Sequence, residues 1–284
     1  MDKSSKDEEN KIVEKWLSGS EDDLKAANLL YDNKLFALCL YHLQQSNEKL
    51  AKALLLSLPL STPKRRPKDY AVQSALGFLP RTPSSYGHRI MPHFLSDIEK
   101  SVPSIQEYLK LLRDSEFGKR ITEFSKTVKT SGENVQKLRK NPPVIIRTTE
   151  NLEKEITSAQ SLLDKVDPIA NKINEELNHL DYTQIVRIAT GVSRKRGFKV
   201  DASRLPSFEE MKTKTGLAFR LSMLTTLSVG LSALLDPLVS VTRYPDSKPI
   251  SVDENDPYVK NFYQFHDVIA RILKMSQQLH KNET

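Results

Sequence analysis

The sequence predicts an all-α fold, and three stretches with helical periodicity carry this prediction. Residues 36–58 place leucines and alanines in two adjacent apolar rows, which is typical of a wide-faced and mostly buried helix. Residues 152–180 hold apolar side chains at alternating spacings of four and three, the pattern of a coiled-coil seam. Residues 257–279 begin with a proline and continue as an amphipathic helix.

The N-terminal part is expected to begin with a disordered polar tail, residues 1–15. Ser20 is followed by three acidic residues, so it is a suitable N-cap for a helix that continues to Tyr31. A short turn at 32–34 then leads into the helix at 36–58, which ends before Pro59.

Polar side chains interrupt the buried face of the helix at 36–58. One interpretation is a solvated stripe with i,i+4 ion pairs, such as Glu48 with Lys52. The other is that these side chains face neighbouring helices, in which case each buried one needs a hydrogen-bonding partner. The residues concerned are Gln44, Gln45, Glu48, Lys49 and Lys52.

The middle of the chain is predicted to form an antiparallel helical hairpin with coiled-coil-like packing. Its arms are residues 118–140 and 150–180, with a Pro-Pro connection at the tip. Pro168 lies inside the second arm, where it predicts either a kink or the start of a new helix. Beyond the hairpin, residues 215–235 form an apolar helix that ends at Asp236-Pro237.

Composition and charge limit the classes of function. The 284 residues carry a net charge of +7, and two basic clusters, 64–68 and 194–196, attract phosphate but lack interleaved aromatic residues. The single cysteine, Cys39, lies in an apolar helix, and the sequence shows neither a secretion signal nor a membrane span. These observations lead us to expect a cytoplasmic protein without membrane contact. Phosphate-loop, dinucleotide and zinc-protease motifs are absent from the sequence, and we therefore expect no cofactor and no metal.

Three segments resemble a known family. Residues 41–54 (Tyr-His-Leu-Gln-Gln-Ser-Asn-Glu-Lys-Leu-Ala-Lys-Ala-Leu) resemble the second helix of HEPN domains. Residues 87–89 are similar to the start of the third helix in that family, with Arg89 where an acidic residue is usual. The string Thr-Arg-Tyr-Pro-Asp at 242–246, which we expect to be a turn, is similar to the element before the last HEPN helix.

The resemblance implies an antiparallel, up-and-down bundle of four or five helices, formed by residues 16–100 and 214–284. Residues 101–213 would then be a mainly helical insertion that contains the hairpin. In such a bundle Gln45 or Glu48 would bond the turn at Arg243-Tyr244 or the helix start at His88. The implied polar cluster is Gln44, Gln45, Glu48, Lys49, Lys52, His88, Arg243 and Tyr244.

Many HEPN proteins are metal-independent ribonucleases, whose Arg and His side chains meet at a dimer interface to bind phosphate and move the 2′-hydroxyl proton. Here Arg89 and His93 are separated by only three residues, with Pro92 between them. His266 and Arg271 have a suitable spacing in the reversed order. These departures favour a non-nuclease member of the family.

For such a member the resemblance implies an interaction or nucleotide-binding module. It would be a homodimer, would bind a nucleotide or RNA, and would act with a nucleotidyltransferase or an antitoxin protein in a toxin–antitoxin or defence setting. Two alternatives stay open. One is a metal-independent endoribonuclease with Arg89 and His93 as its catalytic residues, and the other is a structural scaffold built on the coiled hairpin.

Overall fold

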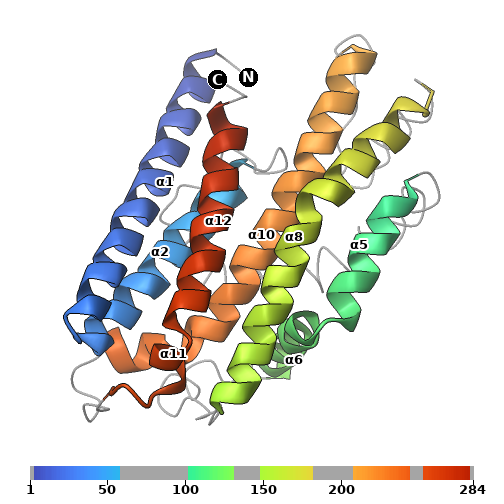
Figure 1. Cartoon of the computed structure of the whole chain (residues 1–284). Coiled ribbons are helices and arrows are strands. Elements are labelled where there is room, and N and C mark those ends of the chain that lie inside the picture. The colour runs from blue at the N-terminus through green and yellow to red at the C-terminus, as the bar shows by residue number, and fades with distance from the viewer. Residues whose placement is uncertain (1–2, 58–101, 131–147, 182–206, 244–251, 282–284) are drawn as a thin grey trace.

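The computed structural model describes residues 3–57, 102–130, 148–181, 207–243 and 252–281, and every regular element in these ranges is a helix (Figure 1). This confirms the all-α prediction. The helices are α1 (Lys3–Asp32), α2 (Phe36–Ser57), α5 (Pro103–Asp114), α6 (Glu116–Thr130), α8 (Thr149–Asn178), α10 (Phe208–Arg243), α11 (Pro257–Lys260) and α12 (Phe262–Lys281).

Helix α2 lies at the centre of the arrangement. It packs against α1 on one side and α10 on the other, and it also contacts α12 (Figure 1). Helix α2 runs antiparallel to both α1 and α10 (Figure 1). A single hydrophobic core joins these four helices to α5, α6 and α8. The segments predicted as bundle and insertion therefore share one interior.

Helix α1 begins at Lys3, so the prediction of a disordered tail is wrong from that residue onward. Ser20 is a buried position in the middle of the helix and does not cap its start. The reason is a seam with alternating spacings of four and three that extends N-terminally from the predicted helix. It consists of Val13, Leu17, Ser20, Leu24 and Ala27, all of which are buried.

Helix α8 does not form one arm of a two-helix coiled hairpin. Figure 1 shows α6 nearly end-on, so it crosses α8 instead of running along it. The buried seam of α8 is shared among α5, α6, α10 and α12. Residues 131–140 of the predicted first arm lie outside the described residues. Helix α8 continues through Pro168, and its ribbon changes direction along its upper part in Figure 1, as a proline kink predicts.

Close approaches hold α6 in its crossing position. The Phe117 side chain is fully buried, and its backbone N–H donates to Ser158 Oγ on α8 at 3.3 Å. Gly230 on α10 leaves room for the Phe117 ring, since a Cβ at residue 230 would lie 2.3 Å from Phe117 Cζ. A larger residue at position 230 would therefore force the Phe117 ring out of its place.

Helix α10 continues to Arg243, so the predicted stop at Asp236-Pro237 is wrong and residues 242–243 are still helical. The Tyr258 hydroxyl donates to the carbonyl of Leu234 at 3.0 Å, close to where Pro237 removes a backbone donor.

The stretch Phe208–Leu235 of α10 is long and apolar enough to cross a membrane by length and composition alone. However, 61% of its apolar window is buried inside the bundle, which is typical of a core helix.

Candidate functional site

The polar residues of α2 lie in contact with the bundle and are not a solvated stripe. The Gln44 and Glu48 side chains are buried, and Gln45, Lys49 and Lys52 are half-buried. Burial of this kind requires partners, because an unpaired polar group away from water costs on the order of 1–3 kcal/mol. The partners fall into two groups along the helix.

The first group surrounds Glu48. Lys52 Nζ lies 2.8 Å from one carboxylate oxygen of Glu48, and Gln45 Nε2 donates to the other at 3.3 Å. Gln45 also donates to Gln44 Oε1 at 3.0 Å. The ammonium of Lys52 lies 4.7 Å from the centre of the Trp16 ring on α1, a cation–π distance. The predicted pairing of Glu48 with Lys52 is therefore confirmed, in a half-buried setting.

The second group surrounds Asp23 on α1. His42 Nδ1 lies 3.0 Å from one carboxylate oxygen, and Lys49 Nζ lies 2.7 Å from the other. Lys49 Nζ also donates to the backbone carbonyl of Gly19 at 3.2 Å. One carboxylate on α1 thus holds two side chains that are two turns apart on α2. Sequence reasoning missed this centre, since it treated Asp23 as part of a helix start.

Two further buried clusters fix the neighbours of α2. Ser46 Oγ donates to the carbonyl of Ser20 at 2.8 Å, and Ser20 Oγ returns a hydrogen bond to the carbonyl of Ser46 at 2.9 Å. On the opposite side, Asn47 Nδ2 donates to the carbonyl of Ser228 and to Ser232 Oγ on α10. The signal for Asn47 was present in the sequence, because it is a polar residue within the apolar row of the helix.

Several predicted site residues cannot be placed. His88, Arg89, His93 and Tyr244 lie outside the described residues, and Arg243 is described only as the last residue of α10. The predicted contact of Gln45 or Glu48 with these residues therefore stays a prediction.

The second Arg–His pair is not assembled within α12. Arg271 forms ion pairs with Asp164 on α8 and with Asp267. His266 lies beside Phe262, with ring centres 5.7 Å apart, and interacts with the backbone of Leu24 on α1. The two side chains thus occupy different faces of the helix.

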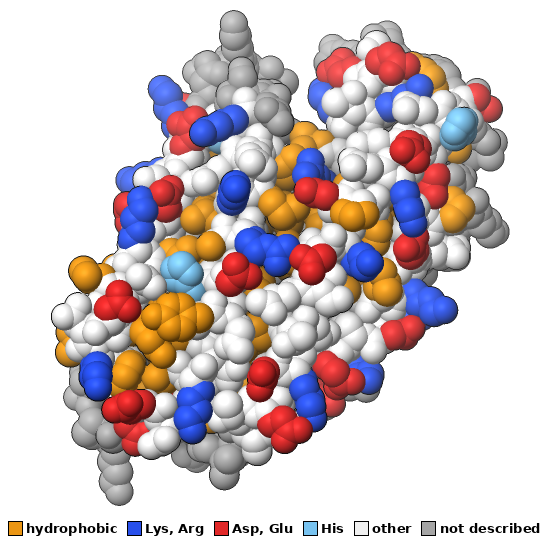
Figure 2. Space-filling model, viewed as in Figure 1, with side chains coloured by type: hydrophobic (Ala, Val, Ile, Leu, Met, Phe, Trp, Pro, Cys, Tyr) orange, Lys and Arg blue, Asp and Glu red, His pale blue; other side chains and the backbone are white. Residues whose placement is uncertain are grey.

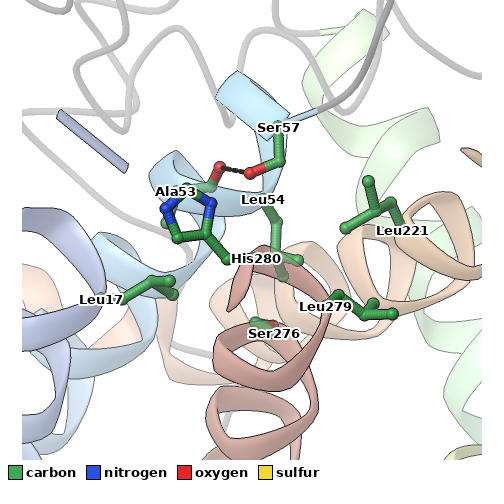
Figure 3. A pocket seen from close by; sticks show the side chains of 8 residues that line it. All are labelled: Leu17, Ala53, Leu54, Ser57, Leu221, Ser276, Leu279 and His280. Atoms are coloured by element: carbon green, nitrogen blue, oxygen red, sulfur yellow. Dashed lines mark hydrogen bonds between the residues drawn. The ribbon is translucent and has the colours of Figure 1, made fainter. Parts of the chain in front are cut away.

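The cavities differ greatly in size. Figure 3 shows side chains of α1, α2, α10 and α12, with His280 among them, around an enclosed cavity of about 10 Å³. That volume accommodates a single water molecule and no nucleotide. An open groove of about 990 Å³ lies between α5, α6 and α8, with both acidic and basic side chains along it.

Cysteine and metal chemistry receive no support from the described part of the chain. Burial raises the pKa of the Cys39 thiol to about 12, so the thiolate that reacts with electrophiles or metals is scarce near neutral pH. Within these ranges no three His, Cys, Asp or Glu side chains are grouped as metal ligands.

Comparison with known proteins assigns the family. No curated protein and no solved structure matches the chain. The HEPN domain, however, matches residues 13–169, which is more than half of the sequence. The matched region starts in the buried seam of α1, includes the polar face of α2, and extends into α8. It thus includes part of the region, 101–213, that the resemblance implies to be an insertion. The chain belongs to the HEPN family.

Proposed function

We propose that this chain is a HEPN-type binding module, which binds a nucleotide together with a protein partner and does not cleave RNA. The observation that carries the proposal is the position of Arg271. Its guanidinium is paired with Asp164, and it lies on a different face of α12 from His266. Within α12 the arginine and the histidine therefore do not converge on one phosphodiester, as paired catalytic groups would have to.

The polar face of α2 supports a role in binding. Its cations are held by carboxylates at fixed positions, Lys49 by Asp23 and Lys52 by Glu48. Side chains that are positioned before a ligand arrives lose less conformational entropy on binding. Titration calorimetry with ATP, AMP and inorganic phosphate tests this part, and we expect heats of binding for at least one nucleotide. Titrations without heat would favour the structural-scaffold alternative.

Absence of ribonuclease activity is tested separately. The full chain is incubated with structured RNA in EDTA, and we expect the RNA to stay intact. Cleavage by the wild type that is lost in both Arg89→Ala and His93→Ala would establish the ribonuclease alternative in place of our proposal.

We propose self-association through the end of the bundle where α1 turns into α2. Four large hydrophobic side chains at this end are exposed: Leu29, Leu35, Leu38 and Tyr263. Figure 2 shows hydrophobic side chains gathered in the region where the lower parts of α1 and α12 lie. Exposed apolar groups that are concentrated in this way are typical of protein interfaces. The family resemblance favours a nucleotidyltransferase or an antitoxin as a further partner.

Light scattering of the full chain measures the oligomeric mass. The double variant Leu35→Ser/Leu38→Ser is expected to shift the protein from dimer to monomer. Leu111→Ser is the matched control, because Leu111 is also an exposed leucine but lies on α5. If the wild type is a monomer, or if the double variant is still a dimer, this interface is wrong.

A further inference from the structure

We propose that His42 and Lys49, held by Asp23, form the site that binds the phosphoryl group of a nucleotide or of RNA. The inference rests on the proposed nucleotide-binding function and assigns it to particular residues. The juxtaposition that carries it is one carboxylate on α1 with a histidine and a lysine from α2 on its two oxygen atoms.

The carboxylate is sheltered, whereas the two nitrogen-bearing groups are accessible. The Asp23 side chain is 13% exposed, while those of His42 and Lys49 are 31% and 30% exposed. Asp23 is therefore the inner part of the cluster, and the other two side chains form its outer surface. An anion that approaches from the solvent meets the lysine and the imidazole before the carboxylate.

Each outer group keeps hydrogen-bonding capacity for a ligand. The Lys49 ammonium has three N–H groups, and its two contacts are with Asp23 and with the Gly19 carbonyl. His42 contacts Asp23 through Nδ1, and no other residue in the described ranges is hydrogen-bonded to Nε2. One ammonium N–H thus remains for a phosphate oxygen, and Nε2 donates to a second one when the ring is protonated.

A protonated imidazole gives the cluster a charge that suits a phosphate. Asp23 balances the charge of Lys49, so only the His42 ring in its protonated form adds a net positive charge. Two nearby carboxylates are engaged elsewhere, because Glu21 contacts Lys25 and Gln277, and Glu48 contacts Lys52. A bound phosphate thus gains attraction from two groups at the cost of repulsion from a single inner carboxylate.

Gly19 helps to hold the lysine in place. The stem of Lys49 passes over this residue, and a Cβ at position 19 would lie 3.3 Å from Lys49 Cδ. A glycine therefore allows the lysine to lie close against α1, where its ammonium reaches both Asp23 and the Gly19 carbonyl.

The test uses the full chain and titration calorimetry with three ligands: inorganic phosphate, ATP and a short single-stranded RNA. Lys49→Gln and His42→Gln are each expected to weaken binding about tenfold. Glutamine at position 42 is uncharged and removes both ring nitrogens, while its amide still has N–H groups to donate. Lys25→Gln is the control, because Lys25 is a highly exposed lysine on α1, and it should leave the affinity unchanged.

A purely structural role is excluded by a second set of measurements. Lys49→Arg should restore binding, and the thermal midpoint of His42→Gln should stay close to that of the wild type. In the wild type, addition of phosphate should shift the NMR signals of the His42 ring, a result that does not depend on the stability of any variant.

The outcomes distinguish a wrong assignment of the binding residues from a wrong proposal of nucleotide binding. If nucleotide or RNA binds with unchanged affinity to both glutamine variants, the site assignment is wrong and the binding module stands. If none of the three ligands binds the wild type, both proposals fail. Binding of RNA or of ATP alone identifies which source supplies the phosphoryl group.

Discussion

The two central helices, α2 and α10, both bury polar side chains, but they satisfy them in different ways. In α2 the polar groups reach across to other helices, as Ser46 does to Ser20 and Asn47 to Ser228. In α10 the buried Thr225 hydroxyl donates to the backbone carbonyl of Leu221 one turn earlier in the same helix, whereas Ser228 bonds across to Asn47. Both solutions avoid an unpaired buried group.

This difference shows what each helix contributes to specificity. A hydroxyl that bonds its own helix is satisfied wherever that helix packs, so it places no condition on the neighbours. A side chain that bonds another helix is satisfied in one register only. The Asn47 bonds with Ser228 and the Ser46 bonds with Ser20 therefore fix the register of α10 and α1 on α2, whereas Thr225 has no influence on it.

The largest expected effect is that of Asn47→Ala. The variant loses the hydrogen bonds to Ser228 and Ser232 and leaves the buried Ser228 hydroxyl without its acceptor. We expect the free energy of unfolding to fall by about 2–3 kcal/mol, measured by urea denaturation. Thr225→Val is the comparison on α10, and its cost should be below about 1 kcal/mol. Equal costs for the two variants would remove the distinction between the helices.

An intermediate effect is expected for the reciprocal pair Ser20 and Ser46. Each change to alanine should cost about 1 kcal/mol, and a double-mutant cycle should show coupling, because the two hydroxyls bond each other's backbone and lie 3.1 Å apart. Ser222→Ala serves as the α10 control, since this exposed hydroxyl bonds only Ala218 within its own helix. Additive costs for Ser20→Ala and Ser46→Ala would mean that the two residues act independently.

The smallest effect concerns His266, which interacts with the Leu24 backbone across the interface with α1. Burial lowers the pKa of His266, although nearby Asp267 opposes the shift, so the folded state favours the neutral ring. Below pH of about 6.5 the unfolded chain binds a proton more readily than the folded chain, and stability falls as the pH falls.

The thermal midpoint should therefore decrease between pH 7.5 and pH 5.5, and His266→Gln should make this decrease smaller. The matched control is His179→Gln, since His179 ends α8 away from this interface. An unchanged pH profile in His266→Gln would show that the proton uptake on unfolding occurs at other groups.

Local periodicity was sufficient to predict the helices that have one continuous apolar face. Helices α2, α8 and α12 fall where the spacing of apolar residues predicts them. The first half of α1 was missed because its surface is strongly polar, and Ser20, which is buried, resembles a cap in sequence. The end of α10 was missed because proline usually ends a helix, and Pro237 therefore predicted a stop. In the structure the helix continues through Pro237 to Arg243, since tertiary packing overrides the local preference.

The site was predictable only in part, for a physical reason. The sequence identified the polar residues of α2, and the structure shows that all five make contacts at the bundle surface or inside it. Their partners Asp23 and Gly19 were not identified, because such pairs depend on the register between α1 and α2. That register results from the packing of whole helices, and local spacing contains no information about it.

The short connection between α1 and α2 has a consequence for the order of folding. The Ser20–Ser46 hydrogen bonds join residues 26 positions apart, whereas the Asn47–Ser228 bond joins residues 181 positions apart. Closing the shorter loop costs less chain entropy, so the α1–α2 hairpin should form early and the docking of α10 should come late. The proposed phosphate site lies entirely within this early hairpin, and its geometry is therefore expected to be established before the bundle is complete.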